Sequence, residues 1–256
     1  MKIVRTRNEL REALGPSRDG LVGLVPTMGA YHDGHLSLFR AARAECDTVV
    51  ASLFVNPAQF AERADLSRYP RDEERDGRLA RENGVDLLFA PAVDELYPPG
   101  FQTWVEVGEL SARLEGEHRP GHFRGVATIC LKLFNLVRPR LAYFGQKDAQ
   151  QVAVLRRMIL DLDLELSLRV LPTVRDADGL ALSSRNALLS PAERERALAL
   201  PRALATRDPA AARAALDGLD VDYVEVVDLD PPVLAAAVRV GSTRLIDNVV
   251  LEEETR

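Results

Sequence analysis

The sequence predicts an α/β fold in which a doubly wound parallel sheet is followed by a smaller α+β domain. Two observations lead to this prediction. Short apolar runs alternate with amphipathic stretches through the first two thirds of the chain, as in a parallel sheet covered by helices on both faces. After about residue 174 this alternation gives way to two helical stretches and three strand-like runs. We therefore predict two domains, at residues 1–174 and 175–256.

The elements of the first domain follow from their own patterns. Strands are expected where short apolar runs stand between turn signals, at residues 21–25, 48–54, 86–90, 103–107, 141–144 and 165–170. Helices are expected where apolar residues recur at helical spacing, at residues 35–45, 71–83, 123–137 and 149–160. Gly84 is the expected stop of the second of these helices. Ligands of such folds bind at the carboxyl ends of the strands.

The second domain begins with a helix signal. Ser190 is the expected N-cap, Pro191 fits the first helical position, and Glu193 completes a capping box. The Ala- and Arg-rich stretch 201–213 is interpreted as a solvated helix. The remaining elements are a helix at residues 209–216 and strands at residues 221–227, 236–240 and 245–250.

The composition limits the classes of function. A net charge of −6 and a pI near 5.4 argue against a general binder of nucleic acids or anionic membranes. The two cysteines make no disulfide framework and fit a reducing compartment. The charged N-terminus lacks the core of a signal peptide, and no run approaches the ~20 apolar residues of a membrane span. We expect a cytoplasmic protein that binds neither nucleic acid nor membrane.

The most informative segment is residues 26–35, which read Pro-Thr-Met-Gly-Ala-Tyr-His-Asp-Gly-His. It joins a predicted strand to a predicted helix, and a helix start offers backbone N–H groups and partial positive charge to a phosphate. Gly29 and Gly34 allow close approach of a ligand, while His32 and His35 add donors that can carry charge near neutral pH. We expect a nucleotide triphosphate site here, with nothing apolar for His35 to pack on.

Other interpretations of this segment stay open. A glycine turn between a strand and a helix often serves only the turn, and the two histidines could be capping residues. A zinc site needs three or four ligands, and Cys46 and Cys130 are not spaced as a Cys-x-x-Cys pair. All four histidines of the chain fall within residues 32–35 and 118–122, and this clustering favours a functional role.

Polar residues also follow two of the predicted strands. Asn56 and Gln59 can donate and accept hydrogen bonds, as recognition of a hydroxy acid requires, although a turn fixed by Asn-Pro is an equal alternative. Lys147 is one of only three lysines among 33 basic residues, and its place at a helix start suits phosphates. Asp148 beside it could accept from ribose hydroxyls or cap the helix.

Two segments of the last third complete the set. Ser183, Ser184 and Arg185 offer two hydroxyls and a guanidinium to phosphate oxygens, although a plain loop could also contain them. Residues 241–248 have the pattern of a buried strand, and we interpret them as structural.

Together and in this order, these segments resemble the pantothenate synthetase (pantoate–β-alanine ligase) family from residue 26 to residue 248. The resemblance implies a Rossmann-like domain of the His-x-Gly-His nucleotidyltransferase type with a small C-terminal lid domain. It also implies a cytoplasmic homodimer that uses ATP and Mg²⁺ to join pantoate to β-alanine, giving pantothenate, AMP and pyrophosphate. The implied route runs through a pantoyl-adenylate, a step of coenzyme A biosynthesis.

The resemblance also implies roles for individual residues. His35 would be the proton donor, and His32, Lys147, Ser183, Ser184 and Arg185 would act with it on the phosphates. Pantoate and β-alanine would be bound by Gln59 and Gln151, with Asn56 and Met28 beside them. The implied ATP-binding residues are Pro26, Thr27, Met28, Gly29, Ala30, Tyr31, His32, Asp33, Gly34, His35, Gly145, Gln146, Lys147, Asp148, Val174, Leu182, Ser183, Ser184 and Arg185.

The chain departs from the family pattern in a few places. Tyr31 and Leu182 stand where Leu and Met are common, and both are expected to pack around the nucleotide. The segment 186–221 is shorter than in the family pattern, so we expect a trimmed lid domain, with consequences for its closure. Asp72 is a candidate ligand of Mg²⁺, and residues 61–71 are expected to form a mobile loop beside the pantoate pocket. Two rival functions are a simple nucleotidyltransferase that needs no pantoate and a non-catalytic nucleotide sensor.

Overall fold

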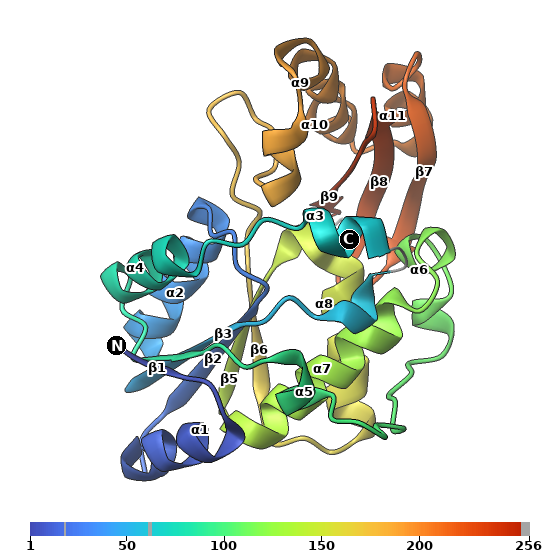
Figure 1. Cartoon of the computed structure of the whole chain (residues 1–256). Coiled ribbons are helices and arrows are strands. Elements are labelled where there is room, and N and C mark those ends of the chain that lie inside the picture. Colours follow the sequence, from blue (N-terminus) through green and yellow to red (C-terminus); the bar gives the residue numbers. More distant parts are fainter. Residues whose placement is uncertain (18, 61–62, 252–256) are drawn as a thin grey trace. The chain divides into compact units, whose positions relative to one another are not determined.

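The computed structural model describes residues 1–17, 19–60 and 63–251 of the chain (Figure 1). The chain forms two compact units. The first contains Met1–Phe144 and Val154–Leu171, and the second contains Gly145–Ala153 and Pro172–Arg256. Each unit has its own hydrophobic core.

The first unit is built on a six-stranded sheet. In spatial order its strands are β1 (Lys2–Val4), β4 (Leu87–Phe89), β3 (Thr48–Leu53), β2 (Val22–Thr27), β5 (Leu141–Gly145) and β6 (Ser167–Leu171). The pairs β1–β4, β4–β3, β3–β2 and β2–β5 are parallel. The strand order reverses between β2 and β5, and ligands of open α/β sheets bind at such reversals. The segment that follows β2 therefore starts at the expected place for a ligand.

Helices cover both faces of this sheet (Figure 1). The helices α2 (Asp33–Glu45) and α4 (Glu73–Glu82) lie on one face, and α1 (Arg7–Leu14) and α7 (His122–Val137) lie on the other. Under α2, the side chains of Phe39 and Ala42 pack in one core with Val25, Val49 and Leu88 of the strands. The other helices of this unit are α3 (Arg63–Arg68), α5 (Val93–Leu96), α6 (Glu115–His118) and the second part of α8 (Ala149–Asp161).

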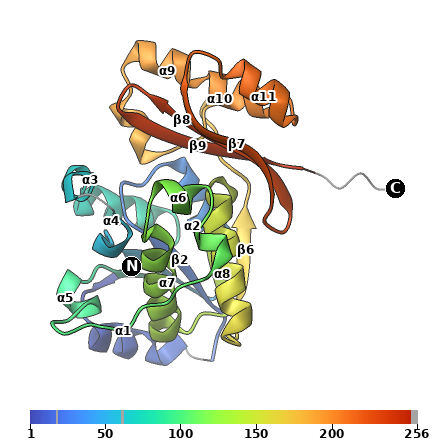
Figure 2. The same ribbon diagram turned by 90° about the vertical axis from the view of Figure 1, so that its right-hand side faces the viewer.

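The second unit is an antiparallel sheet of three strands, β7 (Asp220–Asp228), β8 (Pro232–Val240) and β9 (Thr243–Val250). Three helices lie along this sheet (Figure 2), namely α9 (Pro191–Ala197), α10 (Ala199–Leu204) and α11 (Pro209–Ala215). Leu234, Ala236 and Val238 of β8 form the core with Leu200 and Leu204 of α10. The predicted fold class is confirmed: an α/β sheet with helices on both faces and a smaller α+β part.

The predicted start of α9 is confirmed in detail. Ser190 Oγ accepts from the Glu193 N–H at 3.3 Å, and Glu193 Oε2 accepts from the Ser190 N–H at 2.9 Å. The two hydrogen bonds satisfy N–H groups that a helix start otherwise leaves without partners.

Three expectations about elements are wrong. Residues 103–107 form no strand, because the Val105 N–H donates to Thr128 Oγ1 of α7 at 3.0 Å instead of to a neighbouring strand. Residues 201–213 are not one solvated helix, since α10 buries its apolar side against the second sheet. Residues 61–71 are not all loop: α3 covers residues 63–68, while residues 61 and 62 lie outside the described residues.

Several elements were not expected from the sequence, among them β1, α1, α5 and α6. Both β1 and α1 precede the first predicted strand, and α1 presents only Leu10 and Leu14 as buried residues. None of the helices in the described residues is long and apolar enough to cross a membrane.

Candidate active site

The turn after β2 requires glycine at residue 29 for two reasons. Its backbone φ of +86° lies in the left-handed region that side chains disfavour. A Cβ at this position would also lie 2.6 Å from Leu53 Cδ1 and 2.8 Å from Asp76 Oδ2. The next residue, Ala30, also has a positive φ of 54°. The backbone is thus bent sharply at the point where β2 ends and α2 is about to begin.

A buried carboxylate holds this bend in place. Asp76 of α4 is 1% exposed, and it accepts from the Ala30 N–H at 2.7 Å and from the Tyr31 N–H at 2.9 Å. Charge-assisted hydrogen bonds of this kind are stronger than bonds between neutral groups. The sequence reasoning missed this residue. The available signal was a charged residue four positions before Ala80 on the buried face of α4.

The two histidines form the start of α2. His32 is the N-cap: its Nδ1 accepts from the Gly34 N–H at 3.2 Å, and its own N–H donates to His35 Nδ1 at 3.3 Å. The capping interpretation is therefore correct for both rings. Because each Nδ1 is an acceptor, each neutral ring carries its proton on Nε2 and presents an Nε2–H donor. The cap itself uses the Nδ1 atom of each ring.

The side chain of Tyr31 lies in the core of the first unit. It is 1% exposed and contacts Phe39 edge to face, with ring centroids 5.1 Å apart. Burial raises its pKa, and Thr27 Oγ1 donates to its hydroxyl at 3.2 Å. The expectation that His35 packs on nothing apolar is wrong, since its ring centroid lies 5.4 Å from that of Tyr31.

Asn56 and Gln59 lie in a 3-10 turn, Pro57–Gln59, directly after β3. Asn56 is 1% exposed, and its Oδ1 accepts from the Ala58 N–H at 3.2 Å. Its Nδ2 donates to Gln59 Oε1 at 3.0 Å and to the Gly125 carbonyl of α7 at 3.1 Å. Asn56 therefore fixes the turn, as the alternative interpretation of this segment stated.

Gln59 is brought next to Met28. Its Nε2 lies 3.2 Å from the Met28 sulfur, and Asn56 holds the other end of the same amide. The Gln59 carbonyl accepts from His122 Nδ1 at 3.0 Å, and His122 Nε2 lies 3.2 Å from Arg119 Nη1. His122, from the second histidine cluster of the sequence, therefore supports the turn that carries Gln59.

A pocket of about 280 Å³ opens beside Met28 in the first unit. Asp72 lies on its wall and caps α4, with Oδ1 accepting from the Arg75 N–H at 2.9 Å. Three residues of the segment 61–71, which was expected to be a mobile loop, line the same pocket: Leu66, Pro70 and Arg71. Its mobility stays a prediction.

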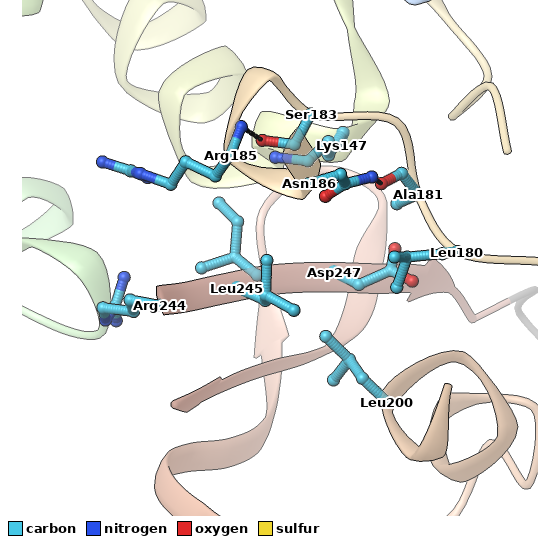
Figure 3. A pocket seen from close by; sticks show the side chains of 11 residues that line it. Lys147, Leu180, Ala181, Ser183, Arg185, Asn186, Leu200, Arg244, Leu245 and Asp247 are labelled. Atoms are coloured by element: carbon cyan, nitrogen blue, oxygen red, sulfur yellow. Dashed lines mark hydrogen bonds between the residues drawn. The ribbon is translucent and has the colours of Figure 1, made fainter. Parts of the chain in front are cut away.

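In the second unit, Lys147, Ser183 and Arg185 line one pocket (Figure 3). Lys147 Nζ lies 3.8 Å from Asp148 Oδ1, and Ser183 Oγ accepts from the Arg185 N–H at 3.2 Å. Three of the four expected phosphate-binding residues of this unit therefore line one pocket, and Ser184 does not. The other expected residues belong to short local segments. Gln146 lies in the turn Gln146–Asp148 with Gly145 before it, and Gln151 lies in the first turn of α8. Ser184 starts a 3-10 turn, and the Leu182 N–H donates to the Val174 carbonyl.

The fold is that of an α/β protein. The segment at the strand reversal is a strand, a turn and a helix start of the type that binds nucleotides. The profile of the family described as "Pantoate-beta-alanine ligase" matches residues 2–250. The chain belongs to the pantoate–β-alanine ligase family.

Similar proteins support this assignment. The chain is 53% identical to a pantothenate synthetase of Acidobacterium capsulatum, over 91% of this chain and 86% of that protein. It is 50% identical to one of Roseiflexus castenholzii, over 98% and 100%. A crystal structure of pantothenate synthetase from Thermus thermophilus is 47% identical, with a TM-score of 0.93 over 98% and 99% of the two chains. A Francisella tularensis pantoate–β-alanine ligase, solved with "Beta-gamma ATP and Beta-alanine", is 33% identical, with a TM-score of 0.88 over 98% and 97%.

Proposed function

We propose that this chain is an ATP-dependent ligase that joins pantoate and β-alanine to give pantothenate, AMP and pyrophosphate. The observation that carries the proposal is the family match over residues 2–250. A relative solved with an ATP-type ligand and β-alanine supports the choice of substrates. The site residues named in the sequence analysis are proposed in the roles given there.

In the first step, a pantoate carboxylate oxygen attacks the α-phosphorus of ATP, and pyrophosphate leaves. The carboxylate is ionised at neutral pH, so this step needs no general base. Negative charge grows on the phosphates, and preorganised donors stabilise such charge most effectively. We assign this task to the Nε2–H groups of His32 and His35, whose orientation is fixed by the cap of α2.

The residues gathered in the second unit have matching chemistry. Lys147, Ser183, Ser184 and Arg185 are proposed to bind phosphate oxygens, with Asp148 and Gly145 at the ribose and Val174 and Leu182 on the adenine side. The pocket that contains Lys147, Ser183 and Arg185 supports the phosphate role, because its lining combines three cations, Arg244 among them, with a hydroxyl and a single carboxylate, that of Asp247.

Pantoate binding is assigned to Gln59 and Gln151, with Met28 and Asn56 in support. Because Asn56 holds the Gln59 amide and also the turn, we propose that Asn56 acts by orienting Gln59. In the second step, the β-alanine amine attacks the acyl carbon of the adenylate and AMP leaves. The amine must arrive unprotonated.

Mg²⁺ is proposed to accompany ATP. In the part of the chain that the structure describes, no three His, Cys, Asp or Glu side chains are grouped as a metal site. This fits a cation held mainly by substrate phosphates with one or two carboxylates, the usual arrangement for Mg²⁺. Asp72, on the pocket wall beside Met28, is the carboxylate that we propose for it. The ion would neutralise phosphate charge.

We also propose a cytoplasmic homodimer with domains at residues 1–174 and 175–256. Cys46 and Cys130 are buried free thiols, which suits a reducing compartment. Light scattering of the purified protein tests the dimer, and limited proteolysis tests the boundary near residue 174.

ATP–pyrophosphate exchange tests the function against both rivals. The ligase should exchange label when pantoate is added alone, and should form pantothenate and AMP once β-alanine follows. Exchange that ignores pantoate would favour the simple nucleotidyltransferase. A protein that binds ATP but never exchanges would be a sensor.

A further inference from the structure

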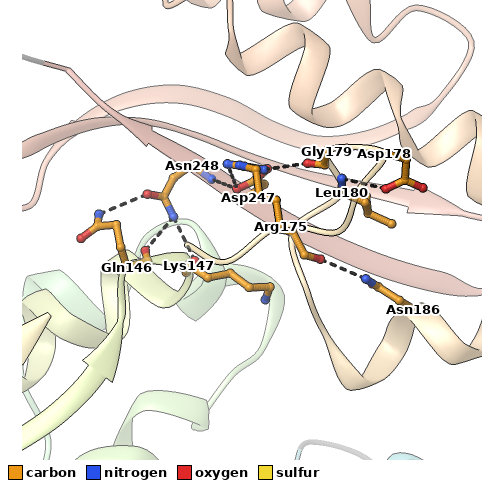
Figure 4. Close-up of polar contacts among 10 residues, drawn as sticks. Gln146, Lys147, Arg175, Asp178, Gly179, Leu180, Asn186, Asp247 and Asn248 are labelled. Carbon is orange, nitrogen blue, oxygen red and sulfur yellow. Dashed lines mark hydrogen bonds and ion pairs between the residues drawn. The ribbon is translucent and has the colours of Figure 1, made fainter. Parts of the chain in front are cut away.

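The turn that carries Lys147 is held by a side chain from β9. Asn248 is 5% exposed, and its Nδ2 donates to the Gln146 carbonyl at 3.0 Å and to the Lys147 carbonyl at 2.9 Å (Figure 4). Its Oδ1 accepts from Gln146 Nε2 at 3.2 Å. Both ends of the Asn248 carboxamide are therefore engaged by one short turn.

These contacts fix the backbone on both sides of Lys147. The Gln146 carbonyl belongs to the peptide plane before the Lys147 Cα, and the Lys147 carbonyl belongs to the plane after it. Peptide units are rigid and planar, so holding both planes fixes the two backbone dihedrals of Lys147. The direction of its Cα–Cβ bond, and hence where its ammonium can reach, follows from those dihedrals.

The neighbouring residue of β9 holds the other half of the same pocket. Asp247 is 2% exposed and accepts from Arg175 Nη1 at 2.6 Å and Nη2 at 3.0 Å. Arg175 also donates to the Gly179 carbonyl at 3.2 Å, and it forms an isolated bridge with Ala181. This fixes the segment that leads to Ser183. Two adjacent residues of one strand thus hold two of the segments that line the pocket, the one with Lys147 and the one with Ser183 (Figures 3 and 4).

We propose that Asn248 is a positioning residue for adenylation, which acts by aiming Lys147 at the phosphates. The segment 241–248 is then more than a buried strand. This inference rests on the proposed function, because it assumes that Lys147 binds phosphate during adenylation.

A double-mutant cycle separates positioning from plain structural support. Pantoate-dependent exchange is measured for the wild type, Asn248→Ala, Lys147→Ala and the double variant, together with the melting temperature of each. A group misplaced by about 1 Å can lose on the order of 10² in rate, so Asn248→Ala should lose roughly that factor. In the Lys147→Ala background the same change should cost less than about threefold, since there is no ammonium left to aim.

Thr243 provides the matched control. It is a buried polar residue of the same strand, 5% exposed, and it pairs with Val240 at the far end of the β8–β9 hairpin from Asn248. Thr243→Ala should lower the melting temperature about as much as Asn248→Ala while leaving exchange within about twofold. Asn248→Ser, which keeps one donor, should lose less of the exchange rate than Asn248→Ala. If the alanine variant does not fold, Asn248→Ser replaces it in the same double-mutant cycle.

Equal losses from Asn248→Ala in both backgrounds would overturn the proposal, as would an equal loss from Thr243→Ala. A wild-type protein without pantoate-dependent exchange would instead overturn the proposed function, and the inference with it. The two failures are therefore distinguishable.

Discussion

Gly125 of α7 lies against the carbonyl of Ala58 so closely that a Cβ at residue 125 would stand 2.4 Å from that oxygen. The same Cβ would lie 2.7 Å from the Gln59 nitrogen. Only glycine fits here, because the turn that carries Gln59 rests directly on the helix. The contact is reinforced by the hydrogen bonds from Asn56 to Gly125 and from His122 to Gln59.

Gly125→Ala should therefore displace Gln59 and weaken pantoate binding. Overpacking of this kind costs about 1–3 kcal/mol, and steady-state kinetics should show the KM for pantoate rising more than the KM for ATP. Gly77→Ala in α4 is the control, since its Cβ would meet only Ile3 and Leu88 side chains at 3.9 and 4.0 Å. That change should leave both constants alone and stabilise the helix by roughly 0.5–1 kcal/mol. Equal kinetic effects at the two glycines would contradict the prediction.

His35→Ala should abolish most adenylation. Loss of one positioned donor typically costs about 10²–10³ in rate, and pyrophosphate exchange measures it. Because the ring also contacts Tyr31 and accepts from the His32 N–H, a modest fall in melting temperature is expected as well. The exposed His118→Ala serves as the control and should keep its exchange rate. Near wild-type exchange in His35→Ala would remove the histidine from the mechanism.

Gln59→Ala and Gln151→Ala should weaken pantoate binding far more than ATP binding. A hydrogen bond to a charged group contributes roughly 1.5–3 kcal/mol, which is about ten- to a hundredfold in affinity. Calorimetric titration with each ligand alone measures both constants. A variant that loses affinity for ATP and pantoate equally would argue against the assignment.

Lys147→Arg should lose most of the adenylation rate and behave like Lys147→Ala. A planar guanidinium cannot occupy the space of a compact ammonium, even though the charge is kept. The melting temperature should barely change, because the side chain lines a pocket and not the core. Lys2→Arg, at an exposed position, is the control. If Lys147→Arg retains most of its turnover, the lysine is an ordinary cation.

The second unit should lose stability in acid partly through Asp178. Arg194 beside it, and then the Leu180 N–H, hold the pKa of this carboxyl below its ordinary value of 3.8. A lowered folded-state pKa contributes stability above the ordinary pKa, and the contribution is lost as pH falls through the folded value. Urea unfolding at pH 6 and at pH 3 should show a smaller acid loss for Asp178→Asn than for the wild type. The exposed Asp217→Asn should behave as the wild type does.

Much of the fold was predictable because its elements have strong local patterns. The helix expected at residues 123–137 is α7, His122–Val137, and the strand expected at residues 48–54 is β3, Thr48–Leu53. The strand expected at residues 103–107 failed because alternation alone does not say whether a neighbouring strand exists. There the Val105 N–H finds a threonine hydroxyl instead.

The sequence could nominate candidate site residues where chemistry and local sequence coincide, as at His32, His35 and Lys147. The residues that hold these segments in place were not predictable where they lie far away in the sequence. Asp76 is 46 residues from Ala30, and Asn248 is 101 residues from Lys147. No spacing rule connects such pairs, because only the folded sheet brings them together.

The buried carboxylate of Asp76 has a consequence for protein engineering. The decapeptide 26–35 looks like a portable binding cassette, since it contains its own glycines, histidines and helix start. Yet two of its N–H groups are satisfied by α4, and Gly29 is shaped around that carboxylate. Grafted onto another strand and helix without an equivalent acid, the decapeptide would relax into a different bend. The transferable unit is the decapeptide together with α4.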